Sequence, residues 1–189
     1  TVANYSTYVG AIDIDTLLGT CSSDAEYTTK NSIGDLNAGA NWNIANTVAN
    51  RWFKFTAPST GLAEITIDVG SGKGDQLRTE AAIWASDGTT EIASARYASQ
   101  EDDVNVSSNS LTPGATYYLS VDVQNFQYTS TFSLCIDTLP SYDFLAGAIN
   151  IDTLKDGCSS DAEYTTVGGT ADLNAGSSWN NGGPLYNKW

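Results

Sequence analysis

The 189-residue sequence contains no histidine and no methionine, and only eight of its residues are Lys or Arg. Without histidine, the chain lacks both the side chain that most often acts as a general base and the commonest metal ligand. No hydrophobic run approaches the ~20 residues of a membrane helix, which predicts no membrane insertion. The basic residues are outnumbered by 22 Asp and Glu, which gives a formal net charge of -14. Because this acidity repels phosphates, we expect no nucleic-acid partner.

Motifs for catalysis are also missing. The sequence has no Gly-x-Ser-x-Gly nucleophile elbow, and its glycine-rich stretch at residues 70–75 lacks the Gly-Lys-Ser/Thr ending of a phosphate loop. The acidic triplet at residues 101–103 lies on an expected loop, where a solvated turn or a cation site is more common than a glycosidase acid pair. With no cofactor motif either, we expect a protein that is not an enzyme.

What the sequence does contain is a repeat. Shifted by 137 positions, residues 10–52 align without gaps with residues 147–189, and 25 of the 43 aligned pairs are identical. The repeat predicts one complete unit over residues 1–137 and the N-terminal part of a second, truncated unit over residues 138–189. A part of this size should not fold alone. We therefore expect it to pack on the first unit, to pair with another chain, or to belong to a longer protein.

From residue 51 onward, short strands alternate with turn residues. Ile65, Ile67 and Val69 alternate with polar residues in the pattern of a half-buried strand. Other strands are expected at residues 52–55, 77–84, 92–97, 104–106, 117–121 and 132–136. No segment longer than a turn has a helical period. The sequence therefore predicts an all-β fold with about eight antiparallel strands in a jelly-roll-like β-sandwich.

The repeat accounts for the odd number of cysteines. Cys21 and Cys135 belong to the complete unit, and Cys158 repeats Cys21. We predict a Cys21–Cys135 disulfide, which would tie the first strand region to the last strand and imply an oxidising compartment. The alternative bond, Cys135 with Cys158, would connect consecutive units, and the sequence leaves it open. A zinc site is not expected without a CxxC pair or histidine.

Three segments resemble a known extracellular module: Asn-Arg-Trp-Phe-Lys-Phe-Thr-Ala-Pro at residues 50–58, Leu-Thr-Pro-Gly-Ala-Thr-Tyr-Tyr-Leu-Ser-Val at residues 111–121, and Thr-Phe-Ser-Leu-Cys-Ile at residues 131–136. They are similar to the β-sandwich repeated in large secreted adhesins and exported enzymes of Bacteroidota, which is related to the bacterial pre-peptidase C-terminal domain. The resemblance implies an extracellular, cell-surface, generally non-catalytic spacer or binding appendage. The chain departs from that family in the length of its N-terminal portion.

The resemblance also implies a modification. Extracellular proteins of that group are O-glycosylated at Asp-Thr or Asp-Ser followed by a small or aliphatic residue, and Asp-Thr-Leu occurs three times in this chain. The expected O-glycan sites are therefore Thr16, Thr138 and Thr153. The alternative is ordinary strand-edge sequence, because so short a pattern arises easily by chance.

Two acidic clusters are candidates for a Ca²⁺ site, because calcium takes about six to eight oxygen ligands. The candidate ligands are Asp24, Glu26 and Asp35 in the first cluster and Asp102, Asp103 and Asn105 in the second. In the second cluster, side chains two positions apart would face the same way if a strand began there. The alternative is repulsive surface charge, since neither cluster has EF-hand spacing.

Tandem units joined by short linkers build rods. The leading hypothesis is a structural or adhesive repeat of a long secreted cell-surface filament or stalk, whose partners are neighbouring repeats of the same protein. The alternatives are a carbohydrate-binding module for surface glycans and an accessory domain of a secreted hydrolase. For glycan stacking the candidate is Trp42 in an Asn-rich stretch, whereas Trp52 and Phe55 lie in a patterned strand and are expected to be buried.

Overall fold

The computed structural model describes residues 4–35, 47–138, 150–155, 157–161 and 164. The chain divides into two compact units, Thr1–Thr138 and Leu139–Trp189. The first unit holds all the strands that the structure describes. None of the helices in the described part of the chain is long and apolar enough to cross a membrane.

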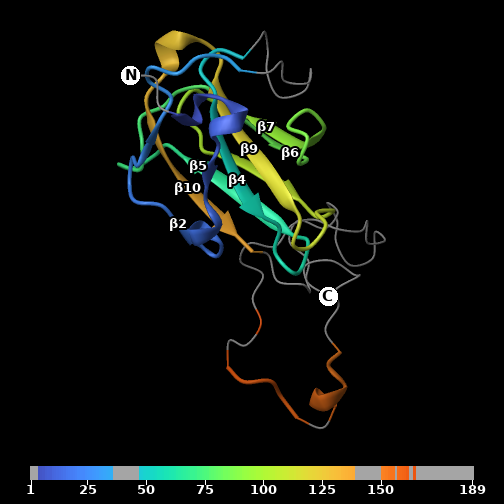
Figure 1. Cartoon of the computed structure of the whole chain (residues 1–189). Coiled ribbons are helices and arrows are strands. Elements are labelled where there is room, and N and C mark those ends of the chain that lie inside the picture. Colours follow the sequence, from blue (N-terminus) through green and yellow to red (C-terminus); the bar gives the residue numbers. More distant parts are fainter. Residues whose placement is uncertain (1–3, 36–46, 139–149, 156, 162–163, 165–189) are drawn as a thin grey trace, which may run out of the picture. The chain divides into compact units, whose positions relative to one another are not determined.

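Two β-sheets pack face to face in the first unit (Figure 1). The five-stranded sheet has the order β1-β4-β9-β6-β7, and the four-stranded sheet has the order β3-β10-β5-β8. The strands are β1 Ile12–Asp13, β2 Thr20–Cys21, β3 Tyr27–Thr28, β4 Arg51–Thr56, β5 Ala63–Asp68, β6 Thr79–Trp84, β7 Glu91–Arg96, β8 Val104–Ser108, β9 Thr116–Val123 and β10 Thr131–Asp137. Short 3-10 helices connect them: η1 Asn4–Ser6, η2 Tyr8–Gly10, η3 Asp15–Leu17 and η4 Phe126–Tyr128, with η7 Asp152–Leu154 in the second unit. The predicted all-β sandwich is confirmed.

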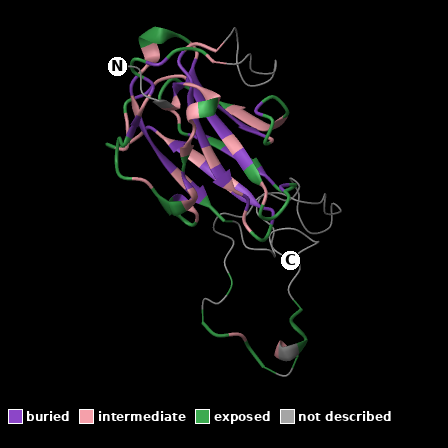
Figure 2. Cartoon of the chain, viewed as in Figure 1, coloured by how far each residue is buried: buried purple, intermediate pink, exposed green. Residues whose placement is uncertain are grey.

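The core lies between the inner faces of the two sheets. Alternation along β5 turns Ala63, Ile65 and Ile67 inward, and all three are fully buried. The rest of the inner faces is also apolar: Phe53 and Phe55 of β4, Leu119 and Val121 of β9, Val104 and Val106 of β8, and Phe132, Leu134 and Ile136 of β10. Figure 2 shows buried residues running along the strands and exposed ones gathered at the turns. Each such side chain contributes about 1.5–3 kcal/mol by leaving water.

One strand pair differs from the antiparallel expectation. β1 runs parallel to β4, with Ile12 opposite Phe53 and Asp13 opposite Lys54. The cause is the path of the N-terminal segment, which follows the edge of the five-stranded sheet at β4 and then crosses to the edge of the other sheet. There β3 pairs antiparallel with β10. We call residues 12–28 the staple, because they join the edges of both sheets.

A second layer covers the outer face of the five-stranded sheet. Trp52 and Trp84 point away from the core, yet both are almost fully buried. The ring of Tyr8, in η2, lies 5.6 Å from that of Trp52 and 4.4 Å from that of Tyr118, measured between ring centroids. Trp84 Nε1 donates a hydrogen bond to Ser120 Oγ at 2.8 Å. The expected burial of Trp52 is confirmed, although its contacts lie outside the main core.

Candidate functional site

The staple contacts both sheets through main-chain and side-chain hydrogen bonds. The carboxylate of Asp15, at the start of η3, accepts from Thr56 N at 2.6 Å and from Thr56 Oγ1 at 2.8 Å. Backbone bonds extend the contact: Ile14 N donates to Lys54 O at 2.9 Å, Gly19 N to Ile136 O at 2.7 Å and Ser22 N to Leu134 O at 2.8 Å. The edge formed by β4 and β10 is therefore a binding surface for the staple.

A disulfide closes this contact covalently. Cys21 and Cys135 are bonded, their Cα atoms are 4.0 Å apart, and 114 positions separate them in the sequence. The predicted pairing is confirmed. Cys158 is free and exposed, so the alternative bond to Cys135 is not formed.

A buried arginine holds the end of the staple from inside. Arg51, the first residue of β4, is only 1% exposed. Its guanidinium donates to two carbonyl oxygens, Thr28 O in the staple at 2.5 Å and Lys30 O just after it at 2.7 Å. It also donates to two hydroxyls, Ser32 Oγ at 3.0 Å and Ser6 Oγ. It also lies 4.6 Å from the centroid of the Tyr5 ring. Burial lowers the pKa of this arginine, and neutral oxygens rather than a carboxylate solvate its charge.

The carboxylates of the first predicted calcium cluster bind three different groups. Asp24 Oδ1 accepts from Lys73 Nζ at 2.6 Å, Glu26 Oε2 from Ser23 N at 2.9 Å and Asp35 Oδ2 from Tyr8 N at 2.6 Å. Asp24 and Glu26 are exposed, and Asp35 is half-buried. Each carboxylate is thus engaged by the protein itself.

The second cluster is divided in the same way. Asp102 Oδ2 accepts from Ser99 N at 2.5 Å, Asp103 Oδ1 from Val69 N at 2.9 Å and Asn105 Oδ1 from Thr66 Oγ1 at 2.6 Å. β8 begins at Val104, so Asp103 precedes the strand on which its alignment with Asn105 would depend. In the part of the chain that the structure describes, no three residues among Asp, Glu, His and Cys form a metal-binding group. Calcium binding stays a prediction without a preformed set of carboxylates.

Sequence reasoning missed a pair of carboxyl groups. Asp68, at the end of β5, lies beside Asp103, and burial together with that neighbour raises the pKa of Asp68. Asp68 Oδ1 also accepts a hydrogen bond from Gly70 N at 3.2 Å. Neither carboxyl lines either of the two pockets described below. The pair therefore organises the loop after β5 through hydrogen bonds to Val69 N and Gly70 N.

The predicted glycan sites are placed only in part. Thr16 and Thr138 are exposed. Thr153 is the middle residue of η7, but its side chain lies outside the described residues, and so does all of Trp42. O-glycosylation and stacking on Trp42 stay predictions.

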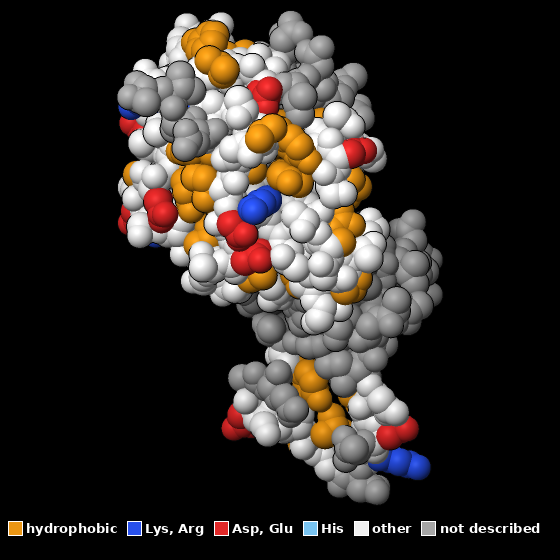
Figure 3. Space-filling model, in the orientation of Figure 1, with side chains coloured by type: hydrophobic (Ala, Val, Ile, Leu, Met, Phe, Trp, Pro, Cys, Tyr) orange, Lys and Arg blue, Asp and Glu red, His pale blue; other side chains and the backbone are white. Residues whose placement is uncertain are grey.

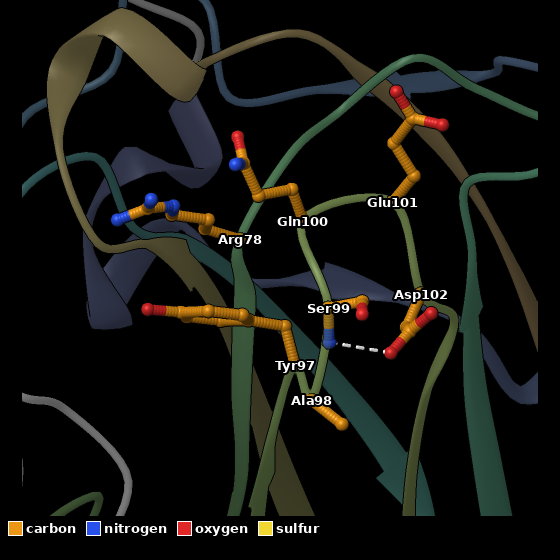
Figure 4. A pocket seen from close by; sticks show the side chains of 7 residues that line it. All are labelled: Arg78, Tyr97, Ala98, Ser99, Gln100, Glu101 and Asp102. Atoms are coloured by element: carbon orange, nitrogen blue, oxygen red, sulfur yellow. Dashed lines mark hydrogen bonds between the residues drawn. The ribbon is translucent and has the colours of Figure 1, made fainter.

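A shallow pocket of about 630 Å³ lies where β7 leaves the five-stranded sheet. It is lined by Arg78 and by Tyr97, Ala98, Ser99, Gln100, Glu101 and Asp102. Figure 4 shows Gln100 and Glu101 projecting on one side of the loop, while Asp102 turns back to Ser99 N. The pocket thus offers an aromatic ring, an amide and a carboxylate within one short loop. A neighbouring pocket of about 490 Å³, lined by residues between Val69 and Leu77, also includes Glu101.

Arg78 organises this pocket. Its guanidinium lies over two aromatic rings, 4.7 Å from the centroid of Tyr128 and 5.8 Å from that of Tyr97, and it also binds Gln124 Oε1. Its backbone N donates to Gln100 O at 2.8 Å, with φ at 49°. A non-glycine residue in this region is uncommon and is held there by its surroundings. No spacing in the sequence indicated this cluster, because its parts come from three separate loops.

Acidic side chains form separate small groups on the face of the first unit shown in Figure 3. Some are held strongly ionised. Hydrogen bonds from Ser130 and Thr131 lower the pKa of Asp75 to about 2, and those from Thr90 and Thr89 lower the pKa of Asp87 to about 2. On this face the acidic side chains are therefore spread out and not gathered in one patch.

Asp122 of β9 behaves in the opposite sense, and its burial predicts a pH dependence. Desolvation raises its pKa to about 6, although its carboxylate accepts hydrogen bonds from Val48 N, Ala49 N and Val123 N. The folded state then holds a proton that the unfolded state releases near pH 4. Through Asp122 alone, the free energy of unfolding should therefore fall by about 3 kcal/mol as the pH rises from below 4 to above 6.

Urea denaturation at pH 4, 5, 6 and 7 measures this change. Asp122→Asn should flatten the slope between pH 4 and pH 6, whereas Asp137→Asn, at an exposed carboxylate, should leave it as in the parent chain. The same slope in Asp122→Asn as in the parent would contradict this role of Asp122 and assign the pH dependence to general charge repulsion.

Comparisons with known proteins add little. No family model matches the chain, and no curated protein matches it. Among solved structures, the chain is similar to the pre-peptidase C-terminal domain of a collagenase from Bacillus anthracis. The two are 15% identical with a TM-score of 0.42, and the match covers 67% of this chain and 93% of that one. A likeness at this level carries no functional argument.

Proposed function

We propose that the chain is a non-enzymatic repeat module of a secreted cell-surface filament or stalk protein, of the adhesin kind found in Bacteroidota. The observation that carries this proposal is the covalent closure of the repeated unit. Cys21 and Cys135 lie near the two ends of a 137-residue repeat, and disulfides of this kind persist in oxidising, extracellular surroundings.

The disulfide gives such a unit a short path for mechanical load. A force applied at the two ends of the unit passes along residues 1–21, through the Cys21–Cys135 bond and along residues 135–138. Residues 22–134, which hold most of the sandwich, lie outside this path. A stalk built of such units would keep its length even when a sandwich unfolds.

Single-molecule force spectroscopy tests this load path. With the full chain held at its ends, unfolding of the first unit under oxidising conditions should release only the short terminal segments. Reduction should add the 114 positions between the cysteines, which is roughly 400 Å of contour length at ~3.5 Å per residue. Cys158→Ser should give the same two lengths as the parent chain. Equal lengths with and without reductant would contradict the proposal, as would the absence of surface labelling by an antibody on intact producing cells.

The pocket beside β7 supports a second candidate function, binding of surface glycans. An aromatic ring beside amide and carboxylate groups is a common arrangement for sugars, because the ring packs on the apolar face and the polar groups bind hydroxyls. In this pocket the ring is Tyr97 and the polar groups are Gln100 and Glu101. An accessory domain of a secreted hydrolase could use the same pocket.

A glycan-array screen of the full chain, followed by titration calorimetry, tests this candidate. Gln100→Ala and Glu101→Ala should each weaken binding of a selected glycan about tenfold, because each removes one hydrogen-bonding group. Asn109→Ala, at an exposed loop position after β8, is the matched control and should bind like the parent. Glycan binding that survives both pocket variants would exclude this pocket.

A further inference from the structure

The N-terminal residues of the first unit lie against the outer face of the five-stranded sheet. We call residues 4–11, which contain η1 and η2, the cover. In Figure 1 the blue turns of the cover lie in front of β4. The ring contacts of Tyr8 with Trp52 of β4 and Tyr118 of β9 agree with this view. The cover therefore shields aromatic side chains on that face from water.

The cover is not part of either sheet. Among the described residues, its hydrogen bonds between main-chain N–H and carbonyl groups are internal, such as Ala11 N to Tyr8 O at 3.2 Å. Within the cover only Ser6 is buried, and Val9 is 94% exposed. The cover is therefore attached to the sandwich through a few side chains and not through a strand ladder.

Tyr8 makes one of the two attachments. Its ring packs on the two aromatic residues named above, and its hydroxyl donates to Ser86 O at 2.5 Å. Its main-chain N donates to Asp35 Oδ2 at 2.6 Å. Gly88 gives the ring its space, because a Cβ at that position would collide with it. The tyrosine thus joins the cover to the sheet and to the turn between β6 and β7.

The second attachment is at Arg51, the first residue of β4. The centroid of the Tyr5 ring lies 4.6 Å from its guanidinium carbon, and Ser6 Oγ accepts a hydrogen bond from the same guanidinium. The Tyr5 ring also lies 5.5 Å from that of Phe53. Both attachments are thus made almost entirely by side chains.

The staple, which follows the cover in the chain, is held more firmly. It pairs with β4, and Ile14 N donates to Lys54 O at 2.9 Å. Ile14 and Leu17 enter the core, with 1% and 8% of their surface exposed. Cys21 then bonds the staple covalently to β10. A load that enters at the N-terminal end of the unit therefore meets the weaker attachment first.

We propose that the cover is a load-released element of the unit. Tension at the N-terminal end peels residues 4–11 off the outer face, while the staple and the sandwich stay folded, and the cover closes again when the tension falls. A segment with few buried contacts opens at a lower free energy than the whole domain. The released segment adds up to about 28 Å of contour length at ~3.5 Å per residue. The inference rests on the proposed function, because only units joined end to end carry tension at their ends.

Single-molecule stretching of the full chain under oxidising conditions tests the release. We expect a step of at most about 28 Å that occurs at a lower force than any other event and reverses on relaxation. Reductant should leave this step unchanged, because the cover precedes Cys21 in the chain. The proposal is overturned if no reversible step precedes the larger events.

Variants of the cover show which contact controls the step. Tyr8→Ala should abolish it, because the cover then loses its main attachment and stays open without force. Tyr8→Phe loses only the hydrogen bond to Ser86 O, so it should lower the force of the step and keep the step itself. Val9→Ala is the matched control, since Val9 lies on the same segment and is 94% exposed. Equal behaviour of Tyr8→Ala and Val9→Ala would rule out the assigned role of Tyr8 and, with it, the proposal.

Hydrogen exchange of the full chain measures the same opening without force. The amide of Ala11 should exchange at least about a hundredfold faster than the amides of β4, because the cover opens locally. Tyr8→Ala should speed the exchange of Ala11 about tenfold further and leave the β4 amides as in the parent, which also shows that this variant folds. If Ala11 and β4 exchange at the same rate, the cover and the sandwich open together and the proposal fails.

The load path through the disulfide and the release of the cover can fail separately. A chain that lengthens on reduction but has no short reversible step keeps the load path and excludes the release of the cover. A chain that has the short step, but whose longer step does not depend on reductant, keeps the release and excludes the load path.

Discussion

Replacing both Cys21 and Cys135 with serine should lower the free energy of unfolding by about 5 kcal/mol, because the bond closes a loop of more than a hundred residues in the unfolded chain. The separation of 114 positions is close to the full length of the unit. A domain of this size has a total stability of about 5–15 kcal/mol, so the variant should unfold at much lower urea concentration. Equilibrium urea denaturation followed by tryptophan fluorescence measures the loss.

The third cysteine provides a control within the same chain. Cys158→Ser should leave the denaturation curve of the first unit unchanged, since Cys158 is free and exposed. Addition of reductant to the parent chain should reproduce the curve of the double variant. A loss below about 1 kcal/mol in the double variant would show that the noncovalent contacts of the staple already restrict the unfolded chain.

The sequence made this disulfide predictable because the repeat assigned the cysteines to units. Cys158 repeats Cys21, which left Cys135 as the partner of Cys21 inside the complete unit. The strand pattern was equally informative, since the alternation of Ile65 and Ile67 with polar residues corresponds to β5. The repeat and the strand alternation are both periodic patterns, and such patterns can be recognised in a sequence without knowing which segments pack together.

The covering of the outer face was not predictable in this way. Apolar and polar residues alternate along the strand that contains Trp52, and this pattern identifies the face that packs in the core. It does not indicate that Tyr8 of η2 covers the opposite face. The parallel pairing of β1 was hidden for a similar reason, because a two-residue strand carries no period. Contacts between segments far apart in the sequence decided both features.

The candidate sites show a comparable limit. Asp24 and Asp103 were proposed as calcium ligands because each lies in an acidic cluster. The structure adds that Asp24 is paired with Lys73 and that Asp103 accepts a hydrogen bond from Val69 N, while calcium binding itself stays a prediction. Composition does not reveal that a carboxylate stabilises a loop by accepting main-chain hydrogen bonds. The cluster of Arg78 with Tyr97 and Tyr128 was missed because its members are brought together only by the fold.

Arg51 leads to the second large expected effect. Arg51→Met should lower the free energy of unfolding by about 3–5 kcal/mol, because it leaves two part-buried carbonyl oxygens and two buried hydroxyls without their donor. The carbonyls of Thr28 and Lys30, at the end of the staple, lose their hydrogen bonds. Arg51→Lys should lie between the parent and Arg51→Met, since one ammonium group cannot reach every acceptor of the planar guanidinium.

Lys54→Met is the matched control on the same strand. Lys54 faces outward with 41% of its side chain exposed, and its only described ion pair, to Asp13, spans 3.7 Å. A solvent-exposed pair contributes at most about 1 kcal/mol, so this variant should denature almost like the parent. Urea denaturation of the three variants gives the order, and proteolysis between residues 12 and 28 reports whether the staple detaches. Equal losses of stability in Arg51→Met and Lys54→Met would contradict this prediction. The hydroxyls and carbonyls around Arg51 would then be hydrated in the variant, and Cys21 and Asp15 would hold the staple without the arginine.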